Sequence, residues 1–217
     1  MTVPSEYRQE LCDALSASED LMRRFDIYAA LLCRWQARIN LVGPSTLPDL
    51  WRRHFFDSAQ LFRHLPADAE ILADIGSGAG FPGLVLAIMA ADGAGPDVHL
   101  IESDTRKAAF LREACRETAA AATVVNVRAE MVDDLSADVV TARACAPLVR
   151  LLPWVDGVLR PGGTALLLKG ASVRDELTAA EKEWTMRTAE IVSAADVSGT
   201  ILKLEGIKKI PRSSPHV

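Results

Sequence analysis

The sequence predicts an α/β fold in which a doubly wound, mostly parallel sheet of about seven strands follows an N-terminal helical extension. Three observations predict it. Apolar residues recur with a helical period near the N-terminus, short apolar runs alternate with helical segments from residue 70 onward, and a glycine-rich turn follows the first run. A chain of 217 residues with 49% hydrophobic composition is long enough for one substantial core.

The first part of the chain is predicted to be helical. Over residues 5–38, apolar side chains recur at steps of three and four residues. They are Leu11, Leu15, Leu21, Phe25, Tyr28, Leu31, Leu32 and Trp35. A break at Gly43-Pro44 precedes a further predicted helix from about Pro48 to about Arg63. We therefore expect residues 1–64 to form a helical extension packed on a single globular domain, residues 65–217.

The rest of the chain alternates between strand and helix patterns. Short apolar runs predict strands at 71–75, 98–101, 123–127, 139–142 and 165–168. The segments between and after them, 82–91, 105–120, 147–160 and 172–184, are predicted to be helical. This alternation is typical of a parallel sheet, which residues 186–193 and 200–205 would close as an antiparallel pair. A ligand is then expected at the carboxyl ends of the strands.

Composition limits the functional classes. The four cysteines include no CxxC pair and the four histidines lack zinc-like spacing, so we expect no metal. The longest uncharged apolar run, Phe81–Ala91, is shorter than the ~20 residues of a membrane span. Charged residues in Met1–Leu11 argue against a secretory signal. We therefore expect a soluble, cytoplasmic protein without a membrane partner.

Charge is distributed unevenly along the chain. The net charge is −5, yet residues 21–64 carry a net +4 and residues 201–217 a net +3, around a middle segment, 65–200, of −8. An acidic body with basic flanks fits an enzyme whose flanks contact an anion such as nucleic acid. Ordinary solvated helix faces explain the charge pattern equally well.

The glycine-rich turn Asp74–Gly80 lies directly between the first predicted strand and the next helix. Its glycines permit a tight turn and let backbone N–H groups approach a ligand closely. Because Gly78–Gly83 also matches the dinucleotide pattern GxGxxG, an NAD-dependent oxidoreductase is one alternative.

Two features of this turn favour S-adenosylmethionine and a Rossmann-like class I methyltransferase. Asp74 stands on the strand immediately before an acid-x-Gly-x-Gly-x-Gly pattern, where it could anchor the turn or face the methionine ammonium. Bulky Phe81 occupies the helix start, where a dinucleotide would place its pyrophosphate. The candidate cofactor-binding residues here are Gly76, Ser77, Gly78 and Phe81.

Further cofactor contacts are predicted at the ends of the second and third strands. A carboxylate at Glu102 can accept hydrogen bonds from both ribose hydroxyls, although a solvated strand-end acid is the alternative. After the third strand, the backbone of Ala129 and the carboxylate of Glu130 suit the edge of an adenine ring. A plain surface position is an equally good interpretation of these last two.

The acceptor side is predicted at the end of the fourth strand. Enzymes that methylate exocyclic amines usually carry Asn/Asp-Pro-Pro-Tyr/Phe there, whereas this chain has Arg143, a cation with donors only. Such a residue fits a nucleophile with a free lone pair, such as guanine N7, and catalysis by positioning without a general base or covalent intermediate. A structural ion pair of Arg143 with Asp74 or Glu130 is the alternative.

Two neighbouring residues also carry reactive or charged groups. Cys145 is in the order Cys-Ala-Pro rather than the Pro-Cys of cytosine-C5 enzymes, and only Arg143 is near enough in sequence to lower its pKa. We interpret it as a small core residue. Lys169, at the end of the fifth strand, could reach an RNA phosphate or be a plain surface lysine.

With these motifs in place, the chain resembles the bacterial 16S rRNA guanine-N7 methyltransferases, the RsmG or glucose-inhibited division protein B family. The motifs that carry the resemblance are Trp35–Leu41, Arg53–Ser58, Asp74–Gly83, Thr105–Leu111, Arg128–Glu130, Arg143–Ala144, Leu168–Gly170 and Lys208–Ile210. The resemblance implies S-adenosylmethionine as cofactor and a guanine of 16S rRNA or of the small subunit as substrate. It also implies that Gly76, Phe81, Ala129, Glu130 and Arg143 line the cofactor site.

The remaining motif residues receive other roles. His54 and Asp57 share one helix face, and we expect them to brace the glycine-rich turn rather than to act in catalysis. RNA contacts are expected from the basic flanks and from Lys169, with Arg52, Arg53, Lys208 and Lys209 as the leading candidates and Arg34 and Arg38 after them. A non-catalytic RNA-binding assembly factor is the second alternative function.

Overall fold

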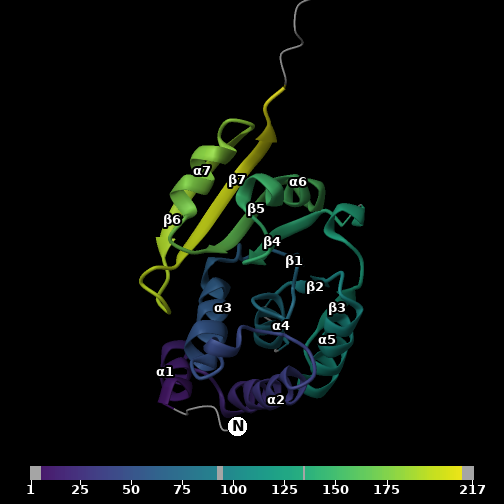
Figure 1. Ribbon diagram of the computed structural model, residues 1–217, viewed down its shortest axis with the longest axis vertical. Coiled ribbons are helices and arrows are strands. Elements are labelled where there is room, and N and C mark those ends of the chain that lie inside the picture. Colours follow the sequence, from purple (N-terminus) through teal and green to yellow (C-terminus); the bar gives the residue numbers. More distant parts are fainter. Residues whose placement is uncertain (1–5, 92–94, 134, 212–217) are drawn as a thin grey trace, which may run out of the picture.

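A computed structural model of the chain describes residues 6–91, 95–133 and 135–211. Its centre is one seven-stranded sheet of order β3-β2-β1-β4-β5-β7-β6 (Figure 1). The strands are β1 Ile71–Ile75, β2 Asp97–Ile101, β3 Ala122–Val125, β4 Ala137–Arg143, β5 Leu159–Lys169, β6 Trp184–Val192 and β7 Thr200–Lys209. β1 to β5 pair in parallel, whereas β7 pairs antiparallel with both β5 and β6. The predicted fold class is therefore confirmed.

Helices cover both faces of the sheet. Before it come α1 Glu6–Leu15, α2 Glu19–Gln36, η1 Pro44–Thr46, η2 Trp51–Phe56, α3 Asp57–Ala59 and η3 Gln60–His64. Within and after it come α4 Gly83–Ala90, α5 Thr105–Thr118, η4 Ala129–Met131, α6 Leu148–Val158 and α7 Val173–Ala180. None of the helices among these described residues is long and apolar enough to cross a membrane.

Alternation along the strands builds two cores, one on each face. Leu72 and Leu166 pack with α2, α4 and α5, whereas their neighbours Ala73 and Leu167 pack with α6 and α7. Successive side chains of a strand point to opposite faces, so a strand covered on both sides reads as a continuous apolar run. This explains why the runs of the sequence predicted the parallel strands.

Some predicted boundaries were wrong. β5 begins at Leu159 rather than at residue 165, and the helix expected to reach residue 184 ends at Ala180. Trp184 instead starts β6, where it is buried and pairs with Lys209. Such pairing between distant residues outweighs the local helical period. The helix expected from 48 to 63 consists of three short turns of π, α and 3₁₀ geometry.

The N-terminal helices hold the glycine-rich turn. Tyr28, on α2, is fully buried, stacks on Phe81 at 5.3 Å and packs edge-on against Phe55 at 5.1 Å. Its hydroxyl donates a hydrogen bond to the carbonyl of Ala79. The extension and the sheet thus share one apolar core around the turn.

Candidate cofactor and acceptor site

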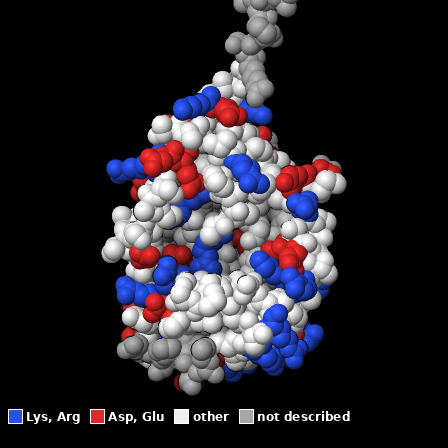
Figure 2. All heavy atoms as spheres, in the orientation of Figure 1, with Lys and Arg blue, Asp and Glu red and all other residues white. Residues whose placement is uncertain are grey.

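A cavity of about 1000 Å³ opens at the carboxyl ends of β1, β2, β4 and β5. This is where an open parallel sheet binds its ligand. Figure 2 shows this face hollowed near its middle, with basic side chains inside the depression. The predicted site residues that line the cavity are Arg53, Gly76, Ser77, Gly78, Phe81, Glu102, Arg143 and Lys169.

The turn between β1 and α4 depends on glycine. Gly76, Gly78 and Gly80 adopt φ values of +68°, +58° and +93°, which side-chain-bearing residues rarely tolerate. A Cβ atom at Gly76 would also lie 2.4 Å from Sγ of Cys145. Because Gly76 and Gly78 carry no side chain, the backbone of the turn faces the cavity directly.

Asp74 anchors this turn through hydrogen bonds to both of its carboxylate oxygens. Its side chain is fully buried, with Oδ1 accepting from Oγ1 of Thr141 at 2.8 Å and Oδ2 accepting from the amide of Gly83 at 3.2 Å. Burial raises the pKa of Asp74 to about 6. The carboxylate does not line the cavity, so of its two predicted roles the structure favours anchoring.

Glu102, at the end of β2, holds the other side of the turn. Its Oε2 accepts from the amide of Gly78 at 2.8 Å and its Oε1 from the amide of Asp104 at 2.7 Å. The side chain is buried, so the alternative of a solvated acid is wrong. Because a carboxylate offers about four acceptor positions, the two oxygens keep capacity for ligand hydroxyls.

Ala129 and Glu130 lie outside the cavity. They form η4 after the edge strand β3, whereas the cavity lining extends only to β2 and the start of α5. Glu130 is exposed. Besides burial, the charge of Glu130 still helps to raise the pKa of Cys145, the residue that packs beneath Gly76, so the predicted adenine contacts of these two residues stay a prediction.

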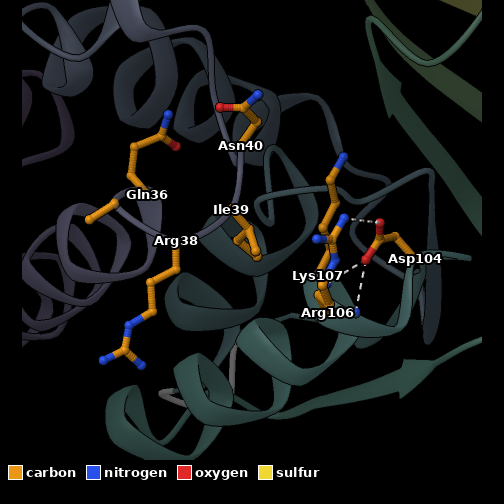
Figure 3. Close-up of a pocket in the computed structure, with 8 residues that line it drawn as sticks. Gln36, Arg38, Ile39, Asn40, Asp104, Arg106 and Lys107 are labelled. Atoms are coloured by element: carbon orange, nitrogen blue, oxygen red, sulfur yellow. Dashed lines mark hydrogen bonds and ion pairs between the residues drawn. The ribbon is translucent and has the colours of Figure 1, made fainter.

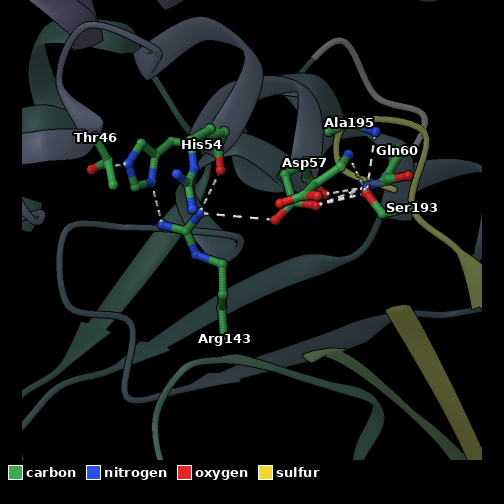
Figure 4. Close-up of polar contacts among 9 residues, drawn as sticks. Thr46, His54, Asp57, Gln60, Arg143, Ser193 and Ala195 are labelled. Carbon is green, nitrogen blue, oxygen red and sulfur yellow. Dashed lines mark hydrogen bonds and ion pairs between the residues drawn. The ribbon is translucent and has the colours of Figure 1, made fainter. Parts of the chain in front are cut away.

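Arg143 is held firmly at the end of β4 (Figure 4). Its Nη2 donates to Nδ1 of His54 at 2.7 Å and its Nη1 to the backbone carbonyl of Arg53 at 3.0 Å. The guanidinium lies 4.8 Å from the centre of the Phe81 ring, as a cation–π contact. The carboxylate nearest to it is that of Asp57, at 4.0 Å, so the expected alternative pairing with Asp74 or Glu130 is wrong.

His54 acts as a neutral acceptor for Arg143. Because a guanidinium can only donate, Nδ1 of His54 must accept, and its Nε2–H then donates to Oγ1 of Thr46 at 2.8 Å. Burial, together with the charges of Arg143 and Arg53, lowers the pKa of His54 to about 3. The imidazole therefore carries no charge at neutral pH.

Asp57 holds a distant loop against the site. Its Oδ1 accepts from Oγ of Ser193 at 3.0 Å and from Nε2 of Gln60 at 2.9 Å, while burial raises its pKa. Gln60 also accepts from the amide of Ala194 at 2.9 Å. His54 and Asp57 thus fix Arg143 and the β6–β7 loop, residues 193–199. The ring of His54 also packs on Phe81 at 5.0 Å, so His54 braces the glycine-rich turn as predicted.

The β6–β7 loop was not predicted as part of the site. Asp196, Ser198 and Gly199 line the cavity although they lie more than a hundred residues from the glycine-rich turn. Their polar, glycine-containing sequence is typical of any surface loop. Hydrogen bonds with Arg52, Asp57 and Gln60, all distant in sequence, place them here.

Cys145 packs against the core, as predicted, and also forms part of the cavity wall. It is half-buried, lines the cavity and packs beneath Gly76. Burial and the charges of Asp74 and Glu102 raise the pKa of its thiol, which disfavours the thiolate that a nucleophile needs.

Two of the predicted RNA contacts have partners within the protein. Lys169 is only 8% exposed, and its Nζ donates to Glu176 at 2.8 Å and to the carbonyl of Ala146 at 3.0 Å. It is therefore neither a surface lysine nor a free cation. Arg52 donates to the carbonyl of Ala195 at 3.0 Å and stacks on Tyr7.

Lys208 and Lys209 lie far from the cavity. Thr200, at the start of β7, pairs with Lys169 at the cavity end of β5, and β7 then runs away from it. Eight residues of extended strand between Thr200 and Lys208 correspond to roughly 26 Å. The two basic flanks of the sequence are therefore separated in the fold, and the RNA contacts predicted at Lys208 and Lys209 stay a prediction.

Comparison with known proteins confirms the resemblance. A family model described as "GidB: rRNA small subunit methyltransferase G" matches residues 21–204. A protein of Paramagnetospirillum magneticum named ribosomal RNA small subunit methyltransferase G is 53% identical over 93% of this chain and 96% of its own. One of the same name from Rhodospirillum centenum is 51% identical over 95% of this chain and 94% of its own.

Solved structures share the fold. A methyltransferase from Pyrococcus furiosus matches with a TM-score of 0.55 at 17% identity, over 84% of this chain and 98% of its own. A SAM-dependent methyltransferase from Aquifex aeolicus matches with a TM-score of 0.54 at 15% identity, over 76% of this chain and 93% of its own. Since the family match spans most of the chain, the chain belongs to the rRNA small subunit methyltransferase G family and is an enzyme that transfers methyl groups.

Proposed function

We propose that the protein transfers a methyl group from S-adenosylmethionine to N7 of a guanine in 16S rRNA, free or within the small subunit, in the cytoplasm. The observation that carries the proposal is the fixed guanidinium of Arg143 beside the glycine-rich turn, in one cavity of about 1000 Å³. Membership of the rRNA methyltransferase family supports the class of substrate.

The residues of the cavity fit the cofactor. Bound S-adenosylmethionine would supply a sulfonium methyl group as the electrophile. The bare backbone of Gly76 and Gly78 allows a ligand to approach closely, and Glu102 keeps acceptor capacity for hydroxyls beside that turn. Phe81 offers an apolar surface in the same cavity.

The acceptor side fits a nucleophile that has no proton to lose. His54 points its Nδ1 lone pair at Arg143, so the imidazole is not a free general base. Arg143 is a donor aimed by two protein acceptors, and it can hold an acceptor group such as guanine O6. Alignment of the nucleophile by such contacts contributes several kcal/mol by positioning alone.

The two alternative functions have less support. A dinucleotide would use the amides at the start of α4, but the amide of Gly83 is buried and bonded to Asp74. A non-catalytic assembly factor would not need a glycine-rich turn open to a large cavity.

The test is methyl transfer from labelled S-adenosylmethionine to 16S rRNA and small subunits from cells that lack the gene. We expect N7-methylguanosine as the labelled nucleoside, identified by mass spectrometry. A label on a pyrimidine carbon or an exocyclic amine would refute the N7 assignment. Binding of rRNA without any transfer would favour the assembly factor.

Glu102→Gln separates cofactor binding from acceptor binding. The amide keeps one acceptor oxygen but places a donor where the other backbone amide donates, so one of the two bracing contacts is lost. We expect a loss of cofactor affinity of about 1–3 kcal/mol by calorimetry. Glu181→Gln, at an exposed position after α7 that does not line the cavity, is the matched control, and an equal loss in both variants would remove Glu102 from the cofactor site.

A further inference from the structure

A second hollow, of about 500 Å³, lies beside the cofactor cavity, between the end of α2 and the start of α5 (Figure 3). We call it the basic hollow; it is lined by Gln36, Ala37, Arg38, Ile39, Asn40, Asp104, Arg106 and Lys107. Lys107 also lines the cofactor cavity, so the two depressions are adjacent.

The basic hollow is formed by two sequence motifs, of which only Leu41 and Lys107 also line the cofactor cavity. One wall comes from the motif Trp35–Leu41 and the other from the motif Thr105–Leu111, about 65 residues later. Figure 3 shows Arg38 on one side and Arg106 and Lys107 on the other, with Ile39 between them.

Both walls are fixed by hydrogen bonds. Oε1 of Gln36 accepts from the amides of Leu41 and Val42 at 2.9 and 3.1 Å, which sets the path of the chain after α2. On the opposite wall, Asp104 accepts from the amides of Arg106 and Lys107 at 2.8 and 3.1 Å. The hollow is therefore held in shape before any ligand binds.

Its charge is opposite to that of the whole chain. Three cations face one carboxylate, that of Asp104, in a protein whose net charge is −5. Across residues 6–91, 95–133 and 135–211, no ion pair involves Arg38 or Lys107, and Arg106 is 74% exposed at 3.6 Å from Asp104. Figure 2 shows basic side chains gathered over α2 and α5 at the lower right of the face.

Two of these cations stand at the start of a helix. Arg106 and Lys107 occupy the first turn of α5, and Asp104 at its N-cap accepts from their amides. The N-terminus of a helix favours negative charge, and here the carboxylate of Asp104 alone supplies it beside two cations. A bound anion would add to this favourable charge.

We propose that the basic hollow binds phosphate groups of the RNA strand that presents the target guanine to the cavity. The proposal rests on the proposed function and names the surface that this function uses. It also replaces the expected C-terminal contacts, since Lys208 and Lys209 lie at the opposite end of the sheet.

The test compares two double variants with the same change in charge. R38E/R106E reverses two cations of the hollow that do not line the cofactor cavity, and K208E/K209E reverses two exposed lysines far away. The readouts are affinity for transcribed 16S rRNA over a salt series, and affinity for S-adenosylmethionine by calorimetry.

We expect R38E/R106E to weaken RNA binding roughly ten-fold or more and to lower the slope of log affinity against log salt by about 0.7 for each lost phosphate contact. Cofactor affinity should stay at the wild-type value. K208E/K209E should keep the wild-type slope.

Unchanged RNA binding in R38E/R106E, or equal losses in both variants, would overturn the proposal. If R38E/R106E also loses cofactor affinity, the milder R38A/R106A variant decides, and a wild-type slope for it overturns the proposal. RNA binding needs no methyl transfer, so the two hypotheses fail separately. A hollow-dependent slope without methylation would leave this inference standing and refute the proposed function.

Discussion

The two walls of the cofactor cavity are built in opposite ways. The turn wall, Asp74–Gly83 with Glu102, is nearly continuous in sequence, and its shape depends on backbone angles and on amides bonded to buried carboxylates. The acceptor wall joins Arg143 to His54, Asp57 and the β6–β7 loop. His54 lies 89 residues from Arg143 in sequence, and Asp57 lies 136 residues from its partner Ser193. The first wall is a local motif and the second exists only in the folded chain.

The largest effect is expected from Gly76→Ala in the turn wall. The variant meets a positive φ of +68° and a contact of 2.4 Å with Sγ of Cys145, so the turn must shift. We expect cofactor binding to be lost, by roughly a hundred-fold or more, because strain of about 1–3 kcal/mol adds to the clash. Calorimetric titration with S-adenosylmethionine measures this loss.

Gly78→Ala is the matched control for this prediction. It carries similar strain, at φ +58°, but its Cβ meets nothing closer than 3.7 Å. It should therefore lose less affinity, and adding Cys145→Ala should partly rescue Gly76→Ala but not Gly78→Ala. Equal losses without rescue would show that strain alone, and not the contact with Cys145, governs the turn.

The next effect concerns the acceptor wall. Arg143→Ala removes the guanidinium held between His54 and the carbonyl of Arg53, and methyl transfer should fall ten-fold or more, about 1.4 kcal/mol per decade. Cys145→Ala, on the neighbouring chain segment, should keep most activity. Single-turnover rates at saturating cofactor measure both. A folded, cofactor-bound but inactive Cys145→Ala would indicate a pyrimidine carbon as acceptor.

This contrast explains what the sequence could reveal. Periodicity and apolar runs predicted the sheet because each strand of the parallel core is buried on both faces. Glycine spacing predicted the turn wall because its function depends on adjacent residues. Arg143 was predicted from its place after a strand, but its partners were not, since no local pattern connects β4 with η2.

The positions of basic residues relative to the cavity could not be predicted from the sequence for the same physical reason. Lys208 and Lys209 were grouped with the site by charge, although the direction of β7 takes them away from it. Arg106 and Lys107 were noticed only as a motif, and their role beside the cavity depends on the packing of α2 against α5. Charge counted along a chain does not give charge in space.

The two walls should also respond oppositely to acid. The pKa of His54, about 3, lies below its ordinary 6.5, so on acidification through that window only the unfolded chain binds the proton, and stability falls. The pKa of Asp74, about 6, lies above its ordinary 3.8, so the folded chain binds the proton first, and this contribution to stability rises as pH falls from 6 to 3.8.

Two variants isolate these contributions. Relative to wild type, His54→Gln should lose less stability between pH 7 and pH 4.5, by an amount on the order of a few kcal/mol. Asp74→Asn should lose more over the same range. Urea unfolding at both pH values gives the free energies, and parallel changes in all three proteins would mean that neither group has a shifted pKa.

The smallest effect is expected where the acceptor wall is fastened to the β6–β7 loop. Oγ of Ser193 donates to Asp57 and accepts from Nε2 of Gln60 at 2.8 Å and from the amides of Ala195 and Asp196, so Ser193→Ala leaves several polar groups short of a bond. We expect a loss of about 1–2 kcal/mol in the free energy of unfolding, because each hydrogen bond contributes about 0.5–1.5 kcal/mol net. Ser198→Ala, in the same loop, is the control, because Ser198 is exposed and its hydroxyl bonds to Asp196 in a solvent-exposed contact, so stability should change by less than about 0.5 kcal/mol. If the hydrogen bonds of Ser193 hold the β6–β7 loop in position at the acceptor wall, Ser193→Ala should also raise the KM for rRNA. Cofactor affinity should stay at its wild-type value. An unchanged KM would show that the loop covers the cavity without positioning the acceptor.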